Sequence, residues 1–212
     1  MIRHHTSRGA LLFLTAAALI LAGCAGVADP TRYYVLSSTS PAPGDPMPIA
    51  ASSAGVGVGP VLVPGYLNRM QIVTRNADEG VEISTYHRWA EPLEAGIAQV
   101  LANDLAMQIG SERVAVFPWR GRITQALDYQ VAVVVLRFEG SPGRQVTLDA
   151  RWRLVGRDGK ELVLKRTTIN EPVTQDGYQS LVLGMNRVLR TLAHEIAAEI
   201  LLRADTRAST TK

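Results

Sequence analysis

Side chains able to perform catalysis or to bind a metal are few in this sequence and stand far apart. Beyond the first 23 residues the histidines are His87 and His194, and neither lies at a metal-ligand spacing from a cysteine or carboxylate. An acid follows His194, as in the helix motif of zinc proteases, but the second histidine of that motif is missing, so a helix-surface position is the simpler interpretation. Glu91, Glu94 and Asp104 could form a carboxylate cluster, although solvated acids near a helix start explain them more simply. We therefore predict no catalytic site, metal or cofactor, and no enzyme.

Cys24 is the single cysteine of the chain, and its position predicts a chemical role. It follows a polar, basic start and an apolar block over residues 10–22. Because about 20 residues are needed to cross a bilayer, this shorter block is typical of a secretory signal peptide. The run Leu21-Ala22-Gly23-Cys24 resembles a bacterial lipobox, in which the cysteine is acylated and becomes the first mature residue. The alternative is an ordinary signal peptide with a stray cysteine.

Lipidation at Cys24 would fix the location of the protein. We predict a lipoprotein signal peptide over residues 1–23 and a lipidated tether over residues 24–31. One acyl chain binds a bilayer only marginally, at about 0.8 kcal/mol per buried methylene, whereas two or more chains anchor a protein firmly. The next residue is Ala25, and by resemblance to enterobacterial lipoproteins the absence of Asp there favours the outer membrane. We expect the protein to be anchored there by its N-terminal lipid, on the periplasmic face.

The charge of the chain argues against nucleic-acid binding. Two of the 22 Lys and Arg residues lie in the first 23 residues, which hold no acid, so the remaining 20 basic and 19 acidic residues nearly balance. A nucleic-acid-binding protein would show clustered Lys and Arg on one face. No second cysteine is available for a disulfide, so packing of the core must stabilise the fold.

The first half of the predicted domain alternates strand and turn signals. Residues 32–38 are rich in strand formers, and the proline-rich stretch that follows reads as an exposed loop. The glycine-rich run over residues 55–64 lacks the Lys-Ser/Thr pair of a phosphate-binding loop, so we interpret it as a strand. Residues 70–85 show the pattern of a β-hairpin. A helix should then begin near Pro92 and stop at Gly110, and a further short strand should follow.

The second half predicts a meander and a long helix. Residues 129–139, 145–155 and 161–169 read as three antiparallel strands joined by short turns. An apolar stripe then predicts a helix from Tyr178 to about Arg203, and the polar residues 204–212 are expected to be disordered. The fold class is α+β: a mixed, largely antiparallel sheet with two amphipathic helices packed on it, in one domain over residues 32–203.

Four stretches, together with the lipobox, resemble one known family. They are YYVLSS, VLVPGYLNRMQIVTR, YHRWAEPLEAGIAQVLANDL and VTLDARWRLVGRDGK. They resemble the paraquat-inducible protein C (PqiC) family, also called ABC-type transport auxiliary lipoproteins. The most specific part is the run Arg88-Trp89-Ala90-Glu91-Pro92-Leu93, so Arg88, Trp89, Glu91 and Pro92 are candidate structural or partner-contact residues.

The resemblance implies an outer-membrane lipoprotein that is a non-enzymatic auxiliary subunit of an envelope transport system for lipids or other hydrophobic molecules. Its implied partner is a membrane-anchored protein with MCE domains, and a homo-oligomer is possible. A periplasmic module that itself binds a lipid or envelope polymer is the alternative, with an apolar pocket between sheet and helices.

Arg151 and Arg153 are the tentative interface residues. They alternate with apolar residues on the strand over residues 145–155, and therefore point to its polar face. A solvated face is the simpler interpretation. If the face is an interface, arginine suits it because its planar group pairs with carboxylates.

Overall fold

The computed structural model describes residues 29–38, 52–76, 78 and 80–210 of the chain, with the side chains of residues 205–210 left undescribed. The signal peptide, Cys24 and most of the proline-rich stretch lie outside the described residues. The chain divides into two compact units, Met1–Pro30 and Thr31–Lys212. The description below concerns the second unit.

The second unit alternates between strands and helices along the sequence. In chain order its elements are β1 (Arg32–Tyr34), β2 (Val56–Leu62), β3 (Gln71–Arg75), β4 (Val81–Trp89), α2 (Leu93–Ile109), β5 (Val114–Val116), α3 (Arg122–Gln125), β6 (Tyr129–Ser141), β7 (Gln145–Gly156), β8 (Glu161–Pro172) and α4 (Tyr178–Thr210).

Five of the strands form the main sheet, in the order β5-β2-β6-β7-β8. β2 lies parallel to both of its neighbours, whereas β6, β7 and β8 form the antiparallel meander that the sequence predicts. Short turns of Gly-containing sequence join the meander strands, as expected for antiparallel neighbours. The glycine-rich run is confirmed as a strand, β2. Its Gly57 allows a close approach, because a Cβ there would lie 2.7 Å from the Leu127 side chain.

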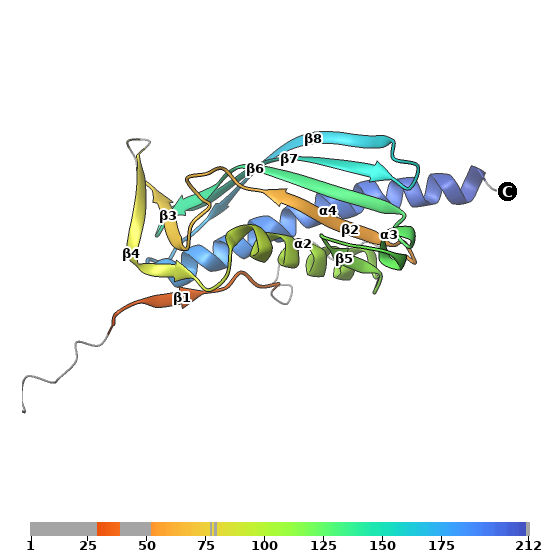
Figure 1. Cartoon of the computed structure of the whole chain (residues 1–212). Helices are drawn as coiled ribbons and strands as arrows, with labels where there is room; N and C mark the ends of the chain where they lie inside the picture. Colours follow the sequence, from red (N-terminus) through yellow and green to blue (C-terminus); the bar gives the residue numbers. More distant parts are fainter. Residues whose placement is uncertain (1–28, 39–51, 77, 79, 211–212) are drawn as a thin grey trace, which may run out of the picture. The chain divides into compact units, whose positions relative to one another are not determined.

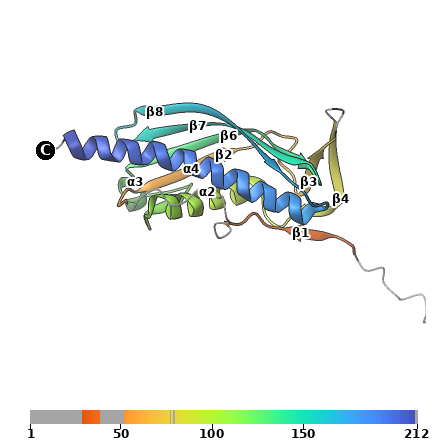
Figure 2. The same ribbon diagram turned by 180° about the vertical axis from the view of Figure 1, so that it is seen from behind.

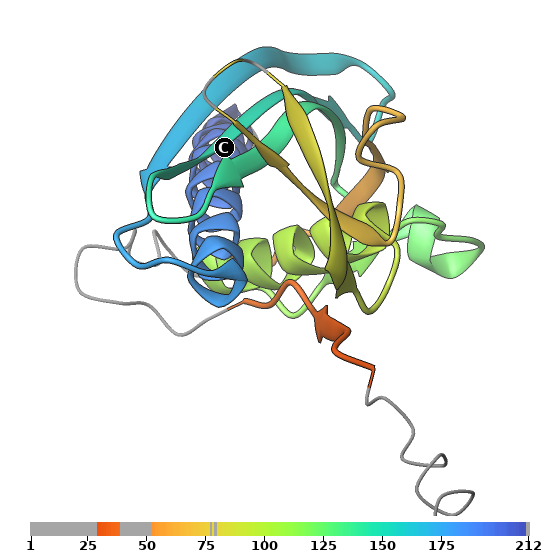
Figure 3. The ribbon, with the colours of Figure 1, turned by 90° about the vertical axis from the view of Figure 1, so that its left-hand side faces the viewer.

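The other three strands form a separate sheet in the order β1-β4-β3. β3 and β4 are the two antiparallel strands of the predicted hairpin, and β1 lies parallel to the C-terminal part of β4. This small sheet stands at one end of the five-stranded sheet, where β3 contacts β6 (Figures 1 and 3). Local sequence patterns predict neither the second sheet nor the β1–β4 pairing, since both depend on contacts between distant residues.

Two helices cover one face of the five-stranded sheet (Figures 1 and 2). α2 packs on β2 and β5, α4 packs on β6, β7 and β8, and the two helices contact each other. The core lies between these layers and is filled by alternate residues of the strands and by the apolar stripes of the helices. The α+β class with two helices on a mixed sheet is thus confirmed.

The helix ends follow the sequence signals closely. Pro92 immediately precedes α2, and Gly110 ends it in a left-handed conformation with φ 62°, which glycine adopts without strain. The backbone of α4 continues to Thr210, beyond the expected end near Arg203. The apolar stripe that predicts the helix ends earlier, because Leu201 is the last buried apolar residue of α4 among the side chains that the structure describes. A helix can continue beyond its apolar stripe, since helix geometry itself needs no buried face.

Candidate functional site

The residues of the family-like motif lie where β4 leads into α2. Trp89 ends β4 and is 3% exposed, so its ring is part of the core. Arg88 is half-buried, and its Nε atom is enclosed without a hydrogen-bond partner among the described residues. Glu91 is half-buried and Pro92 is exposed. The motif therefore combines a core anchor with polar residues near the surface.

The histidines of the described region contact other elements of the fold. A hydrogen bond of 2.7 Å joins His87 Nδ1 and the Tyr34 hydroxyl, and the His87 ring stacks on Tyr178 with 3.8 Å between centroids. Burial, followed by the charge of nearby Arg32, lowers the pKa of His87. His194 is half-buried and hydrogen-bonds Gln108 across the two helices, so it is not simply a surface residue.

The carboxylates around α2 do not form a solvated cluster. Asp104 is 1% exposed and lies inside the helix layer, which corrects the interpretation of this residue as a solvated acid. It falls on the buried side of α2 together with Leu101 and Leu105. Glu94 is half-buried, and its Oε1 accepts a hydrogen bond from the Val63 backbone N–H at 3.2 Å. Within the part of the chain that the structure describes, no group of three or more His, Cys, Asp or Glu side chains could hold a metal ion.

The face of the five-stranded sheet opposite the helices carries an exposed apolar surface. The β-sheet register places Leu62, Val134 and Arg151 in one row across the sheet, and Ala132, Arg153 and Leu164 in the next. Residues of both rows point to the same face, away from the buried alternate residues Val133 and Trp152. We call these six residues the open-face patch.

The open-face patch is unusually apolar for an exposed surface. Leu62, Val134 and Leu164 are 51%, 42% and 65% exposed. A depression of about 380 Å³ lies over the patch. Arg151 and Arg153 are exposed beside it, and neither side chain forms a hydrogen bond or ion pair with another described residue. The structure thus brings both tentative interface residues next to exposed apolar side chains.

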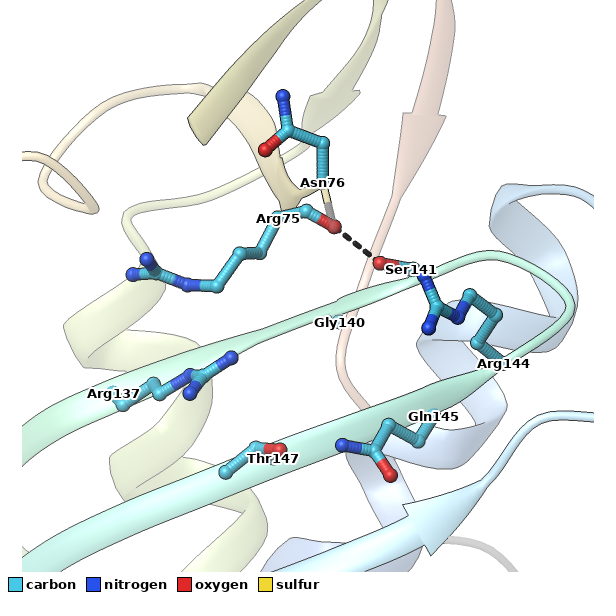
Figure 4. A pocket seen from close by; sticks show the side chains of 8 residues that line it. All are labelled: Arg75, Asn76, Arg137, Gly140, Ser141, Arg144, Gln145 and Thr147. Atoms are coloured by element: carbon cyan, nitrogen blue, oxygen red, sulfur yellow. Dashed lines mark hydrogen bonds between the residues drawn. The ribbon is translucent and has the colours of Figure 1, made fainter. Parts of the chain in front are cut away.

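A second surface feature, which we call the arginine pocket, was not predicted from the sequence. It is a cavity of about 300 Å³ where β3 meets the β6–β7 turn, and Figure 4 shows its lining. The lining side chains are all uncharged or basic: Arg75, Asn76, Arg137, Gly140, Ser141, Arg144, Gln145 and Thr147. The Ser141 hydroxyl donates a hydrogen bond to the Arg75 carbonyl, so the turn is tied to β3.

A buried carboxylate holds two of these arginines in place. Glu139 has a fully buried side chain, and its Oε1 accepts hydrogen bonds from the Nε atoms of Arg75 and Arg137 at 2.8 and 2.9 Å. Its Oε2 accepts from the Tyr66 hydroxyl at 2.8 Å and from the Phe138 backbone N–H at 3.0 Å. Burial, strengthened by the bond to Glu139, raises the pKa of Tyr66 to about 12. Both carboxylate oxygens of Glu139 therefore have hydrogen-bond partners although they are buried, and the carboxylate orients both guanidinium groups.

One signal in the sequence could have revealed the arginine pocket. Glu139 and Arg137 are the charged residues of the largely apolar strand over residues 129–139, and a buried acid needs a partner. Their spacing of two residues puts both side chains on one face of the strand, so Arg137 is a partner that local sequence can suggest, whereas Arg75 lies 64 residues earlier and could not be predicted. Among the described residues, no helix combines the length and apolar character required to cross a bilayer.

Comparison with known proteins gives a family and a fold. The sequence model for the ABC-type transport auxiliary lipoprotein component matches residues 34–197. The crystal structure of an uncharacterised protein has a TM-score of 0.63 and 22% identity, over 80% of this chain and 98% of that chain. Protein XCC0632 from Xanthomonas campestris has a TM-score of 0.62 and 15% identity, over 83% of this chain and 99% of that chain. At these sequence identities the comparison shows that the folds are similar, and nothing more. No curated protein matches the sequence.

Proposed function

The chain belongs to the ABC-type transport auxiliary lipoprotein family, and from this premise we propose that it is a non-enzymatic docking subunit of an envelope transport system. In this proposal it is held in the outer membrane by lipid on Cys24 and faces the periplasm. It binds a membrane-anchored protein with MCE domains, which carries lipids or other hydrophobic molecules across the envelope. Residues 1–23 are the signal peptide and residues 24–31 the tether.

The open-face patch is the observation that carries this proposal. Exposed apolar side chains grouped on one face are typical of a protein-binding surface. Arginine is enriched at the energetically dominant positions of interfaces, and its planar group pairs with carboxylates. Because Arg151 and Arg153 form no ion pair with other described residues, both are available to acidic side chains of a partner. We infer a partner surface that is apolar at its centre and acidic at its edge.

A double charge reversal tests the docking function. Arg151→Glu with Arg153→Glu should leave the fold nearly intact, since exposed charges contribute only about 0–1 kcal/mol. It should greatly reduce recovery of the MCE-domain protein when the tagged lipoprotein is purified from detergent-solubilised envelopes. Arg120→Glu with Arg122→Glu is the matched control, because both of these arginines are exposed and lie outside the patch. Equal recovery with both double variants would exclude the patch as the docking site.

A second copy of the chain is another possible occupant of the patch. Size-exclusion chromatography with light scattering separates the two cases. Loss of an oligomer in the Arg151→Glu, Arg153→Glu variant, with the partner still recovered, would assign the patch to self-association.

The anchor is tested separately. Cys24→Ala should release the protein from membranes, because the acyl chains supply nearly all of the bilayer affinity in this proposal. Fractionation of envelopes on a density gradient measures both retention and the choice of membrane. A Cys24→Ala variant that still sediments with outer membranes after a high-salt wash would contradict anchoring by lipid.

A cavity favours the lipid-binding module as the second candidate. It measures about 450 Å³ and lies between α2 and β2, lined in part by Val61, Leu62, Ala95, Ala98 and Phe117. Its volume falls within the range of about 300–1,000 Å³ that is usual for small-molecule sites. Co-purification of lipid with the mature protein, and its loss in an Ala98→Trp variant that fills the cavity, would support this candidate over docking.

A further inference from the structure

We propose that the arginine pocket binds a phosphate group, and that its source is the headgroup of an anionic phospholipid. This proposal rests on the membrane anchoring proposed above only for the source of the phosphate. The affinity for phosphate itself follows from the charge, the donors and the rigidity of the pocket.

The pocket has an excess of positive charge. Three arginines and no carboxylate line it. Glu139 lies behind the lining and is fully buried, so it compensates one of the three charges. Asp176 lies beside the β6–β7 turn, against Gly143, but does not line the pocket. An anion that enters the pocket therefore meets the positive charge of Arg144, which forms no ion pair with a described residue.

Arg137 and Arg144 offer guanidinium donors to an anion in the pocket. Arg137 uses its Nε for Glu139, and its two Nη atoms have no partner among the described residues. The Arg144 guanidinium is exposed and likewise forms no ion pair with a described residue. In Figure 4 the side chains of Arg137 and Arg144 extend toward each other along β6, whereas the Arg75 side chain, which comes from β3, extends to the side of Arg137 and away from Arg144. Forked guanidinium groups match the spacing of phosphate oxygens.

Two of the three arginines of the pocket are held in place before any ligand binds. Glu139 orients Arg75 and Arg137 through short hydrogen bonds from a fully buried position. The Ser141 hydroxyl joins the β6–β7 turn to the backbone of Arg75. Little side-chain entropy is then lost when an anion binds, which raises the affinity.

The position of the pocket favours a lipid headgroup as the source. β3 carries Arg75 and pairs with β4, which in turn pairs with β1. The β6–β7 turn and β1 lie at the same end of the second unit (Figures 1 and 2). From Cys24 to Arg32 the chain can span at most about 29 Å, so a lipid on Cys24 would keep this end near the bilayer. An acyl anchor combined with basic residues is a known way to hold a protein on an anionic membrane surface.

The experiment uses the mature lipoprotein in micelles of an uncharged detergent that contains no phosphorus. Phosphatidylglycerol, phosphatidylcholine and inorganic phosphate are added in separate titrations at constant ionic strength, and broadening of the ³¹P resonance reports binding. We expect saturable binding of phosphatidylglycerol, weaker binding of zwitterionic phosphatidylcholine, and a loss of affinity of about tenfold in Arg144→Gln. Arg120→Gln, an exposed arginine outside the pocket, is the matched control and should bind like the unaltered protein.

The possible results separate the parts of the proposal. Binding of inorganic phosphate without phosphatidylglycerol would support the phosphate site and overturn the lipid source. No saturable binding, or equal affinities in Arg144→Gln and Arg120→Gln, would overturn the site. If the ligands do not bind but Arg144→Gln loses the protein partner, the pocket is a contact for an acidic protein and the proposal is wrong. The titration with inorganic phosphate does not depend on the anchor, and envelope fractionation of Cys24→Ala tests the anchor independently.

Discussion

Replacing Glu139 with glutamine tests the network that joins β3 to the five-stranded sheet. Glutamine keeps the shape of the side chain and one acceptor oxygen, but it removes the charge and places an amide N–H₂ where an acceptor stood. In the unaltered protein both carboxylate oxygens accept hydrogen bonds, from Arg75, Arg137, Tyr66 and a backbone N–H. The variant therefore leaves at least one donor without its acceptor.

The expected loss of stability follows from burial. Removing one partner of a buried ion pair costs about 3–5 kcal/mol, because the other charge is left uncompensated. The side chains of Arg75 and Arg137 are 19% and 35% exposed, so water can partly replace the lost carboxylate. We therefore expect the lower end, about 3 kcal/mol. For a domain of this size that corresponds to a decrease in melting temperature of about 6–12 °C.

Urea unfolding of the mature protein, followed by tryptophan fluorescence and circular dichroism, measures this loss. Tyr66→Phe serves as the graded comparison, since it removes only one hydrogen bond to Glu139 and should cost about 1 kcal/mol. The two changes should not be additive when combined, because both affect the same network. An unfolding midpoint of Glu139→Gln equal to that of the unaltered protein would refute the argument that the network stabilises the fold. Strict additivity in the double variant would refute the coupling.

Two further predictions concern stability. Trp89→Ala should lower the free energy of unfolding by about 3–5 kcal/mol because the ring is buried, whereas Tyr86→Ala, a half-exposed aromatic of the same strand, should cost far less. Equal melting temperatures of these two variants would show that Trp89 is not a core anchor. The hydrogen bond from Arg166 lowers the pKa of Asp149 below its ordinary value of 3.8, so the stability that Asp149 adds is present above that pH and is lost as the pH falls through the lower, folded-state pKa. Asp149→Asn should therefore be less stable than the unaltered protein at pH 7 in thermal melts and should approach it at acidic pH, and a constant difference across that range would contradict the assignment.

Local patterns predicted the parts of the fold that depend on neighbouring residues. The meander of β6, β7 and β8 follows from alternating strands and short turns, and the limits of α2 follow from Pro92 and Gly110. The division into two sheets could not be predicted, because β1 pairs with residues 87–89, and no local signal specifies a partner so distant.

Local sequence patterns also predict only part of the candidate surfaces. Arg151 and Arg153 were predicted to lie on the polar face of their strand, and the structure places them there. The apolar residues beside them come from β2, β6 and β8, and only the sheet order brings them together. The acidic side chain of Asp104 predicts exposure, but the residue is buried because it shares the inward side of α2 with apolar residues.

The parallel pairing of β2 has a consequence for the folding of a chain that is made from its N-terminus. β2 ends at Leu62, yet its two neighbours in the sheet begin only at Val114 and Tyr129. Pairings between such distant segments form slowly, because a long loop must close before any contact is gained. Until residues 114–116 are available, the apolar β2 has no partner on either edge, and until residues 129–134 are available one edge stays open and can pair with other chains. A chaperone that binds extended apolar segments should therefore associate with the nascent N-terminal half and be released once β6 is available.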